Sequence, residues 1–440
     1  MRTFFFRALL FSIALVIAVS VQAKDLHVSK EKGDNQNPGT KEAPFKNLEA
    51  AFKIAQAGDR ILVAQGNYTG LRDKGYLEIA QPVEILGGYS HDFSTRDIVR
   101  YQTTIMPSRE SGESGRKPLL SILNVPSGTT CIVDGLIFDR GEQNAYSTKE
   151  SVIESISGRI LSPTEKPPTG PSTVDEPLLC FTNKVNAKIE GDLIIRNCVF
   201  LNGHFAIQGG FKKGTVQILN NIFIANKMAA IEVFGIGGKK GPKGPIEKDG
   251  HVEIAHNTIL FTWSRLKDFG DMGYGIRIMT MASYDIHDNI IGCNIFTGID
   301  HTRGNLNEWV KIDNNLIFLN KQAPLLYVEP GKSAAGKMER VKIDDMNADL
   351  GLLSCKGNTE KVTHTLPFNK IYFVNFLNAR YSETADFDPS SPANVLREVM
   401  GLPKQGTLTT KVSMFANRYP LNDALLFFGA ITSAGAQHPK

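Results

Sequence analysis

The chain has 440 residues but few cysteines and almost no excess of either charge. Five cysteines, an odd number spread thinly, do not form a disulfide framework, and we expect most of them to be small buried residues. Lysine and arginine total 49 against 45 acidic residues, so the chain lacks the overall basic charge that attracts nucleic acid. The composition, 42% hydrophobic, excludes disorder, collagen and a coiled coil. We expect no nucleic-acid partner.

Long apolar runs are also absent, except at the N-terminus. Arg2 and Arg7 precede an apolar stretch at 8–19, and small side chains follow at 21–23. This pattern predicts a secretory signal peptide over residues 1–23. The apolar stretch is too short to span a membrane comfortably, no later segment is apolar for about 18 residues, and no cysteine follows the cleavage point to accept a lipid. We expect a monomeric secreted, periplasmic or cell-surface protein without an integral membrane segment.

A repeat occupies the middle of the chain. Five segments between 194 and 320 each carry an Ile three residues before an Asn and an apolar residue two after it. The five asparagines are Asn197, Asn221, Asn257, Asn289 and Asn315. Each repeat reads as three short alternating strands joined by turns. Coils stacked about 4.8 Å apart would form three parallel sheets around one core, with inward asparagines hydrogen-bonded between coils. The pattern therefore predicts an all-β fold, a single-stranded right-handed parallel β-helix.

The predicted organisation is one β-helix domain over residues 24–440. The N-terminal cap covers about 24–60 and contains an amphipathic helix over 48–57, which closes the open end of the solenoid. The Asn-bearing coils span about 194–330. Periodicity weakens beyond this point, so we expect looser coils and an irregular C-terminal cap over about 340–440.

With these coils and its N-terminal segment, the chain resembles the secreted right-handed β-helix proteins of the pectin lyase-like superfamily. The matching N-terminal residues are Asp34, Asn37, Gly39, Thr40, Pro44, Phe45, Leu48, Ala51, Ala55, Gly58, Asp59, Ile61, Val63, Gly66 and Tyr68. This superfamily includes polysaccharide lyases, uronate epimerases, glycoside hydrolases and adhesive proteins, so the resemblance is specific for fold rather than for function. It also implies that the third strand of each coil belongs to the sheet that forms the substrate groove.

Carried onto this sequence, the resemblance predicts an outward column along that groove. Its members are Gln208, Glu232, Arg277, Asp300 and Tyr327. The neighbouring outward positions are predicted to be the small residues Ala206, Ala230, Gly275 and Gly298, against which a sugar ring could lie. The loop 262–274 is expected to wall the groove. Gln208 and Tyr327, together with Trp263, Arg265 and Lys267 from that loop, are the predicted substrate-binding residues.

The centre of this column suggests chemistry on an acidic polysaccharide. Glu232, Arg277 and Asp300 would stack with the two carboxylates about 9.6 Å apart. β-Elimination on a uronic acid needs a group that neutralises the sugar carboxylate and a base near its α-proton. Arg277 could bind the carboxylate, or Glu232 and Asp300 could hold a Ca²⁺ that does so. We expect no other cofactor.

The catalytic base and the reaction class stay open at this stage. Candidates for the base are Arg277, His204, His301 and Tyr274. The leading hypothesis is a polysaccharide lyase or the related uronate epimerase. An inverting glycoside hydrolase is the second, because 9.6 Å lies at the upper edge of the inverting carboxyl separation. The third is a non-catalytic glycan-binding or surface-structural protein, since Glu-Arg-Asp is also an ordinary cross-strand ion-pair ladder. The sequence names neither glycan nor linkage.

Overall fold

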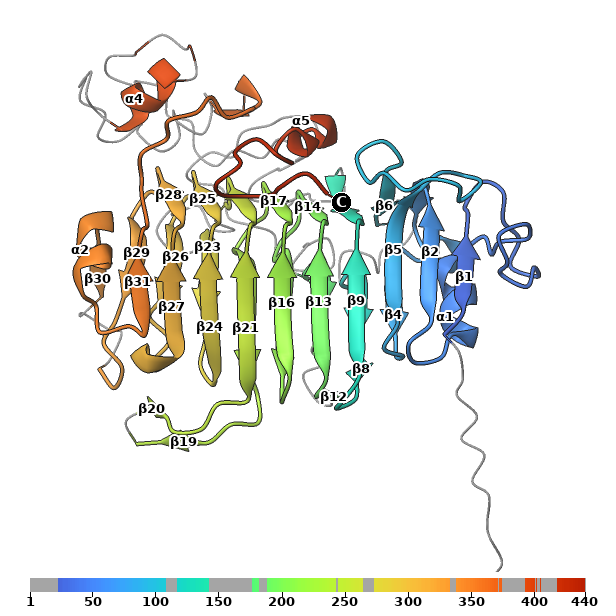
Figure 1. The fold of residues 1–440 in the computed structure, drawn as a ribbon, viewed down its shortest axis with the longest axis horizontal. Coiled ribbons are helices and arrows are strands. Elements are labelled where there is room, and N and C mark those ends of the chain that lie inside the picture. The colour runs from blue at the N-terminus through green and yellow to red at the C-terminus, as the bar shows by residue number, and fades with distance from the viewer. Residues whose placement is uncertain are drawn as a thin grey trace, which may run out of the picture.

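The three predicted sheets are present and run side by side along the molecule (Figure 1). The computed structural model describes residues 23–107, 117–141, 176–181, 188–242, 244–263, 273–332, 338–370, 372–373, 392–399, 401, 404 and 418–439. Each successive coil adds one strand to each sheet, and neighbouring coils pair in parallel. The protein is a parallel β-helix. Residues 1–22 of the predicted signal peptide lie outside the described part.

Sheet A contains β1 (Asp25–Val28), β2 (Arg60–Ala64), β5 (Glu84–Tyr89), β9 (Thr130–Asp134), β13 (Asp192–Arg196), β16 (Thr215–Leu219), β21 (Gly250–Ala255), β24 (Ala282–His287), β27 (Val310–Asp313) and β31 (Ser354–Lys356). Sheet B contains β3 (Gly66–Tyr68), β6 (Thr103–Ile105), β10 (Ile137–Asp139), β14 (Val199–Leu201), β17 (Ile222–Ile224), β22 (Thr258–Leu260), β25 (Ile290–Gly292) and β28 (Leu316–Phe318).

Sheet C contains β4 (Leu77–Ile79), β7 (Leu120–Ile122), β11 (Leu179–Cys180), β15 (Ile207–Phe211), β18 (Ala229–Gly235), β23 (Tyr274–Ile278), β26 (Thr297–His301), β29 (Ala323–Tyr327) and β30 (Glu339–Val341). Two short pairs, β8 (Asn124–Val125) with β12 (Lys188–Ile189) and β19 (Lys240–Gly241) with β20 (Gly244–Pro245), complete the described strands. Short 3₁₀ turns lie at Leu71–Asp73 and Asn307–Trp309.

The core lies inside the tube and is built from equivalent residues of successive coils. In sheet A, one buried isoleucine from each of the coils between β13 and β27 stacks in register on the next, as Ile218, Ile254 and Ile286 do. In sheet B, Phe138, Phe200 and Phe223 stack nearly parallel with 4.9 Å between ring centroids. Each such side chain contributes about 1.5–3 kcal/mol by its burial. Repetition of apolar residues at one coil position therefore stabilises the solenoid.

The predicted asparagine ladder is present at the bend between sheets A and B. The side-chain oxygen of each ladder asparagine accepts a hydrogen bond from a backbone N–H of the preceding coil. The Asn221 N–H donates to Asn257 Oδ1 (2.9 Å), and the Asn257 N–H donates to Asn289 Oδ1 (2.9 Å). The ladder members are Asn221, Asn257, Asn289, Asn315 and Asn358. A second ladder, with Asn226, Asn294 and Asn320, lies at the bend between sheets B and C. These bonds satisfy backbone groups that the bends leave unpaired.

The first repeat is shifted by one residue from the predicted alignment. Ile195, not Ile194, pairs with Ile218, so Cys198 occupies the ladder position. Asn197 instead donates a hydrogen bond to Asp134 (3.0 Å). Its φ of 54° is left-handed, a conformation that asparagine adopts more readily than most residues. The assignment of Asn197 to the ladder was therefore wrong.

Helices cover both ends of the tube. α1 (Leu48–Ile54) occupies the predicted helical segment and packs on β1 and β4, with Leu48 and Ala51 buried. At the other end, β30 pairs antiparallel with β29, and α2 (Ile343–Ala348) packs against β31. Among the described residues, no helix is long and apolar enough to span a membrane.

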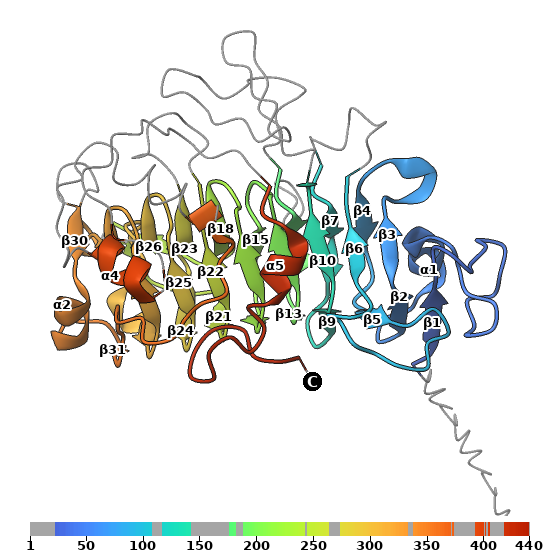
Figure 2. The same cartoon turned by 90° about the horizontal axis from the view of Figure 1, so that it is seen from above.

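Beyond β31 the C-terminal region differs from the expected coils and cap, because residues 418–439 fold back along the solenoid. α4 (Pro392–Val399), α5 (Leu421–Leu425) and the segment 418–439 lie over the outer face of sheet B (Figure 2). There Tyr419, Phe427 and Phe428 pack in one buried cluster with Ile222 and Leu260. The outer face of sheet B is apolar, so it needs this cover to be removed from water.

Candidate active site on sheet C

The predicted column is present on the outer face of sheet C for four of its five members. β15, β18, β23 and β26 hold Gln208, Glu232, Arg277 and Asp300 in register. The fifth position is Leu326, which pairs with Asp300, whereas Tyr327 pairs with His301. Tyr327 was therefore wrongly placed. Leu326 follows Asn315 by the same 11 residues that separate Glu232 from Asn221, so constant spacing was a better guide than side-chain polarity.

Hydrogen bonds join the column into one continuous chain. Arg277 donates from Nη1 to Glu232 Oε2 (2.5 Å) and from Nε to Asp300 Oδ2 (3.2 Å). Gln208 Nε2 donates to Glu232 Oε1 (2.7 Å), and the Thr302 hydroxyl donates to Asp300 Oδ1 (2.7 Å). One guanidinium thus bridges two carboxylates, and each carboxylate has a further donor.

These charges are buried rather than exposed along a groove. The side chains of Arg277 and Glu232 are 9% and 8% exposed, and that of Asp300 is 1% exposed. Arg303 places its Nε 4.0 Å from Asp300 Oδ2. The four groups have no net charge when ionised, which offsets part of the large cost of removing charges from water.

An apolar patch borders the column where small residues were predicted. Its members are Phe205, Met228, Ala229, Tyr274, Phe296, Ala323 and Leu326. Ala206 and Ala230 face the interior core instead, and a Cβ on Gly275 would meet the interior ladder residue Asn294. The prediction of small outward residues was wrong because two consecutive residues, Ala230 and Ile231, both face inward at the start of β18.

Tyr274 connects the patch to the column. The Arg277 guanidinium lies 4.4 Å from the Tyr274 ring centroid, and the ring meets Phe296 edge-on at 5.0 Å. Burial and the Asp300 charge raise the pKa of Tyr274 despite the opposing Arg277 and Arg303 charges. The phenol is therefore protonated at neutral pH and can serve as a proton donor.

The two candidate histidines lie in different places. His301 is fully buried inside the solenoid and meets Tyr327 edge-on at 5.5 Å, because consecutive strand residues face opposite sides of a sheet. Burial lowers its pKa to about 4. His301 does not fit a base at the column. His204 lies in the turn before β15, buried against Phe205 at 5.0 Å, and stays a candidate.

The predicted groove wall is only partly described. Trp263 is 1% exposed and packs over sheet B, where its Nε1 donates to the Tyr372 hydroxyl (2.6 Å). It does not wall a groove on sheet C, so that prediction was wrong. Arg265 and Lys267 lie outside the described residues. Thr302 and Arg303 were missed, although their position directly after the strand that carries Asp300 could have indicated them.

The tentative calcium site does not fit the described side chains. Glu232 and Asp300 are both engaged by Arg277, whose guanidinium lies between them. Calcium takes six to eight oxygen ligands, and a neighbouring cation opposes its binding. Within the described ranges, no group of three His, Cys, Asp or Glu residues is placed to hold a metal ion.

Comparisons with known proteins leave the activity open. The family model described as a protein of unknown function (DUF1565) matches residues 31–106, which precede the column. No curated protein matches the chain. Among solved structures, pectate lyase Pel9A has 12% identity and a TM-score of 0.36, over 68% of this chain and 70% of its own.

Two further solved structures are similar at comparable levels. The GH136 lacto-N-biosidase from Eubacterium ramulus has 10% identity and a TM-score of 0.33, over 69% of this chain and 57% of its own. A rhamnogalacturonan lyase has 9% identity and a TM-score of 0.21, over 68% of this chain and 74% of its own. No specific activity follows from these likenesses.

Proposed function

We propose that the protein is a carbohydrate-active enzyme that cleaves an acidic polysaccharide by β-elimination at the sheet C column. The observation that supports this is Arg277, a buried guanidinium held between Glu232 and Asp300 and stacked on Tyr274. Buried ion pairs add little stability compared with apolar packing, so their presence on an outer face favours a functional role.

In this proposal a uronate carboxylate replaces Glu232 at Arg277. The Arg277 side chain is buried and paired, so the substrate meets a guanidinium that must first release a carboxylate. The exchange substitutes one carboxylate for another at the Arg277 guanidinium, so the charge paired with Arg277 is unchanged, while Asp300 still accepts from Nε. Binding to the guanidinium neutralises the sugar carboxylate and makes its α-proton more acidic.

The displaced Glu232, still within reach of Gln208, then serves as the base. It removes the α-proton, the C–H electron pair forms the new double bond, and the glycosidic C–O bond breaks. Tyr274 gives its proton to the departing oxygen. Return of a proton to the opposite face of the same carbon would instead epimerise the uronate, so an epimerase uses the same groups.

The geometry disfavours an inverting hydrolase. Such an enzyme needs its two carboxyl groups far enough apart for a sugar and a water molecule. Here Glu232 and Asp300 are bound to nitrogens of the same guanidinium. A non-catalytic glycan-binding protein stays the second candidate, because every charge in the column already has a partner.

The test is a panel of uronate polymers and neutral glucans incubated with the mature protein, with and without Ca²⁺. Absorbance at 235 nm together with new reducing ends supports a lyase, and reducing ends alone indicate a hydrolase. NMR of the recovered polymer detects epimerisation. Glu232→Gln should abolish turnover, whereas Lys311→Gln on sheet A is the matched control. If none of the uronate polymers is changed chemically, the enzymatic proposal is overturned.

A further inference from the structure

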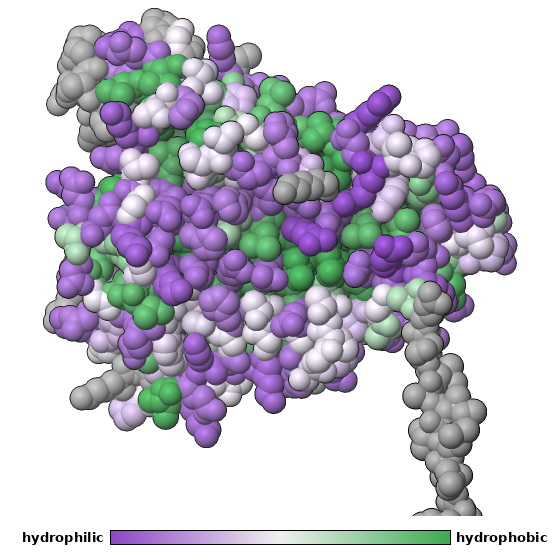
Figure 3. Space-filling model, viewed as in Figure 1, coloured by the Kyte–Doolittle hydropathy of each residue, from purple (hydrophilic) through white to green (hydrophobic). Residues whose placement is uncertain are grey.

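A polar groove lies at the bend between sheets A and B. The C-terminal segment crosses the strand ends there (Figure 1). We call it the corner groove. It has a volume of 570 Å³, and its polar lining includes Arg96, Arg196, Glu253, His256, His287 and His438. Hydrophilic side chains cover much of the sheet A face that borders it (Figure 3).

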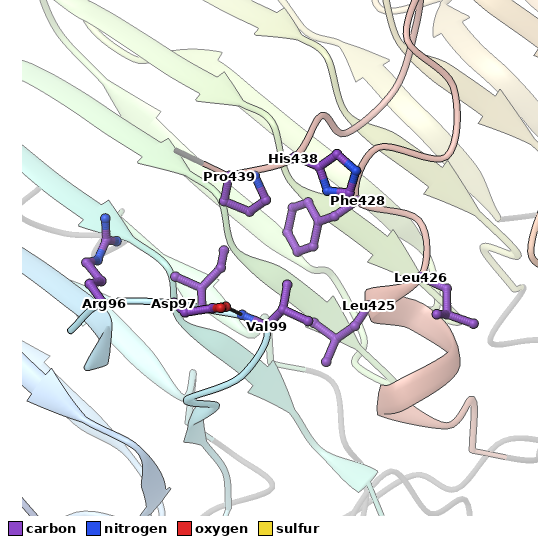
Figure 4. A pocket seen from close by; sticks show the side chains of 9 residues that line it. Arg96, Asp97, Val99, Leu425, Leu426, Phe428, His438 and Pro439 are labelled. Atoms are coloured by element: carbon purple, nitrogen blue, oxygen red, sulfur yellow. Dashed lines mark hydrogen bonds between the residues drawn. The ribbon is translucent and has the colours of Figure 1, made fainter. Parts of the chain in front are cut away.

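A neighbouring pocket of 560 Å³ shares Arg96 and His438 with the corner groove. Figure 4 shows Arg96 at one end of this pocket and Leu426 at the other, with Phe428 and His438 of the C-terminal segment between them on one side. The two pockets therefore adjoin.

The coil register explains the layout of the groove. Arg196, Leu219, Ala255 and His287 occupy equivalent outward positions in successive strands of sheet A. Leu219 and Ala255 thus lie between a cationic residue at one end and a histidine at the other. Three strand spacings separate the two ends, about 14 Å.

One end of the groove carries an excess positive charge. Arg96 (2.6 Å) and Arg196 (2.7 Å) both bind Asp134, which is buried and also accepts from Asn197 (3.0 Å). Burial opposes the charged form of Asp134, but the Arg96 charge and these hydrogen bonds outweigh it and lower its pKa. Arg196 uses only Nε, so within the described part of the chain its Nη groups have no partner.

The other end carries two neighbouring histidines. His287 Nδ1 lies 2.8 Å from Asp288, and its Nε2 lies 3.5 Å from Glu253. Burial alone would lower the pKa of His287, but Asp288, Asp285 and Glu253 outweigh it and raise it. The His256 ring lies 6.1 Å from that of His287, and its buried Nδ1 has no partner among the described residues.

The acceptors of the groove, in contrast, are already engaged. Glu253 accepts a hydrogen bond from Gln217 (2.7 Å) and faces His287. The side-chain oxygen of Asn197 accepts from the Asn220 amide, and that of Asn220 accepts from the backbone N–H of Gln437. The Nη groups of Arg196 therefore remain available as donors, whereas these acceptors are engaged, which suits a ligand that brings negative charge.

We propose that the corner groove binds an acidic saccharide, with an anionic group at Arg96 and Arg196. Its lining contains no Phe, Tyr or Trp on which a nucleic-acid base could stack. The groove lies on sheet A and the column on sheet C, so this binding is independent of the activity proposed above. The protein would hold an acidic glycan on a surface separate from its reactive column.

The test is isothermal titration calorimetry at low salt with three probes. They are a galacturonate hexasaccharide, a sulfated dextran oligosaccharide and neutral maltohexaose. We expect binding of an acidic probe and none of the neutral one, and the acidic probe that binds distinguishes a carboxylate from a sulfate preference. Arg196→Gln should weaken binding about tenfold, because it removes charge-assisted hydrogen bonds.

Lys213→Gln is the matched control. It removes one positive charge from the exposed turn before β16 begins, whereas the corner groove lies where β16 ends. It should change affinity less than twofold. Arg196→Gln keeps an amide donor for Asp134, and its thermal unfolding checks that it folds. Three results would overturn the proposal: equal effects of Arg196→Gln and Lys213→Gln on affinity, binding of maltohexaose, or no binding of either acidic probe. Acidic binding lost in Arg277→Met but retained in Arg196→Gln also overturns it, because the site is then on sheet C.

Discussion

Replacement of Arg277 by methionine should destabilise the protein strongly. The change removes the cation between two carboxylates whose side chains are 8% and 1% exposed. Loss of one partner from a buried ion pair costs about 3–5 kcal/mol, because the remaining charge is left uncompensated in a poorly solvated place. Gln208 and Arg303 still contact the carboxylates, so we expect the lower half of that range, about 3–4 kcal/mol.

Unfolding in guanidinium chloride, followed by circular dichroism, measures this loss of stability as a shift in the denaturant concentration at the unfolding midpoint. The triple variant with Glu232→Gln and Asp300→Asn as well removes the unpaired charges, and should recover to within about 2 kcal/mol of wild type. Lys311→Met is the control, because its pair with Asp285 (3.4 Å) is partly exposed and contributes at most about 1 kcal/mol. A cost for Arg277→Met no larger than that for Lys311→Met would show that the column is solvated, and our reasoning would be wrong.

Three other substitutions test separate parts of the structure. The pKa of His301 is lowered to about 4 by burial, so its neutral form stabilises the fold above pH 6.5, and about 3 kcal/mol is lost as the pH falls towards 4. Urea unfolding above pH 6.5 and near pH 4 should show this loss of unfolding free energy in the wild-type protein and not in His301→Gln. Equal losses in the two proteins would refute the prediction. Asn257→Ala leaves buried ladder groups unpaired and should cost about 3 kcal/mol in the same assay, and a cost below 1 would exclude a stabilising ladder. Phe427→Ala should cost about 3–5 kcal/mol if the C-terminal segment seals sheet B, and a neutral effect would mean that it does not.

The sequence predicted the coils well because each coil repeats the same inward residues. It erred at Asn197 because the left-handed position and the ladder position are adjacent in the chain, and asparagine suits both. The reversal of the C-terminal region was not predictable from local periodicity. Phe427 and Trp263 pack against sheet B, and neither has a repeat partner in the sequence that signals this contact.

The candidate site was predictable in position but not in character. Register alone brought Glu232, Arg277 and Asp300 together, since constant offsets in the repeat fix which residues stack. Their burial and the stacking of Arg277 on Tyr274 depend on how β18 and β23 begin, where the strict alternation fails. Such local irregularities leave no period in the sequence, so the aromatic border of the site became visible only in the structure.

The crystal structure of the protein soaked with a galacturonate oligosaccharide tests the proposed enzyme most directly. We expect a sugar carboxylate on the Nη groups of Arg277, with Glu232 displaced towards Gln208 and Asp300 still bound to Nε. An oligosaccharide bound only elsewhere, with the Glu232–Arg277 pair intact, would contradict the assignment of this column as the reactive centre.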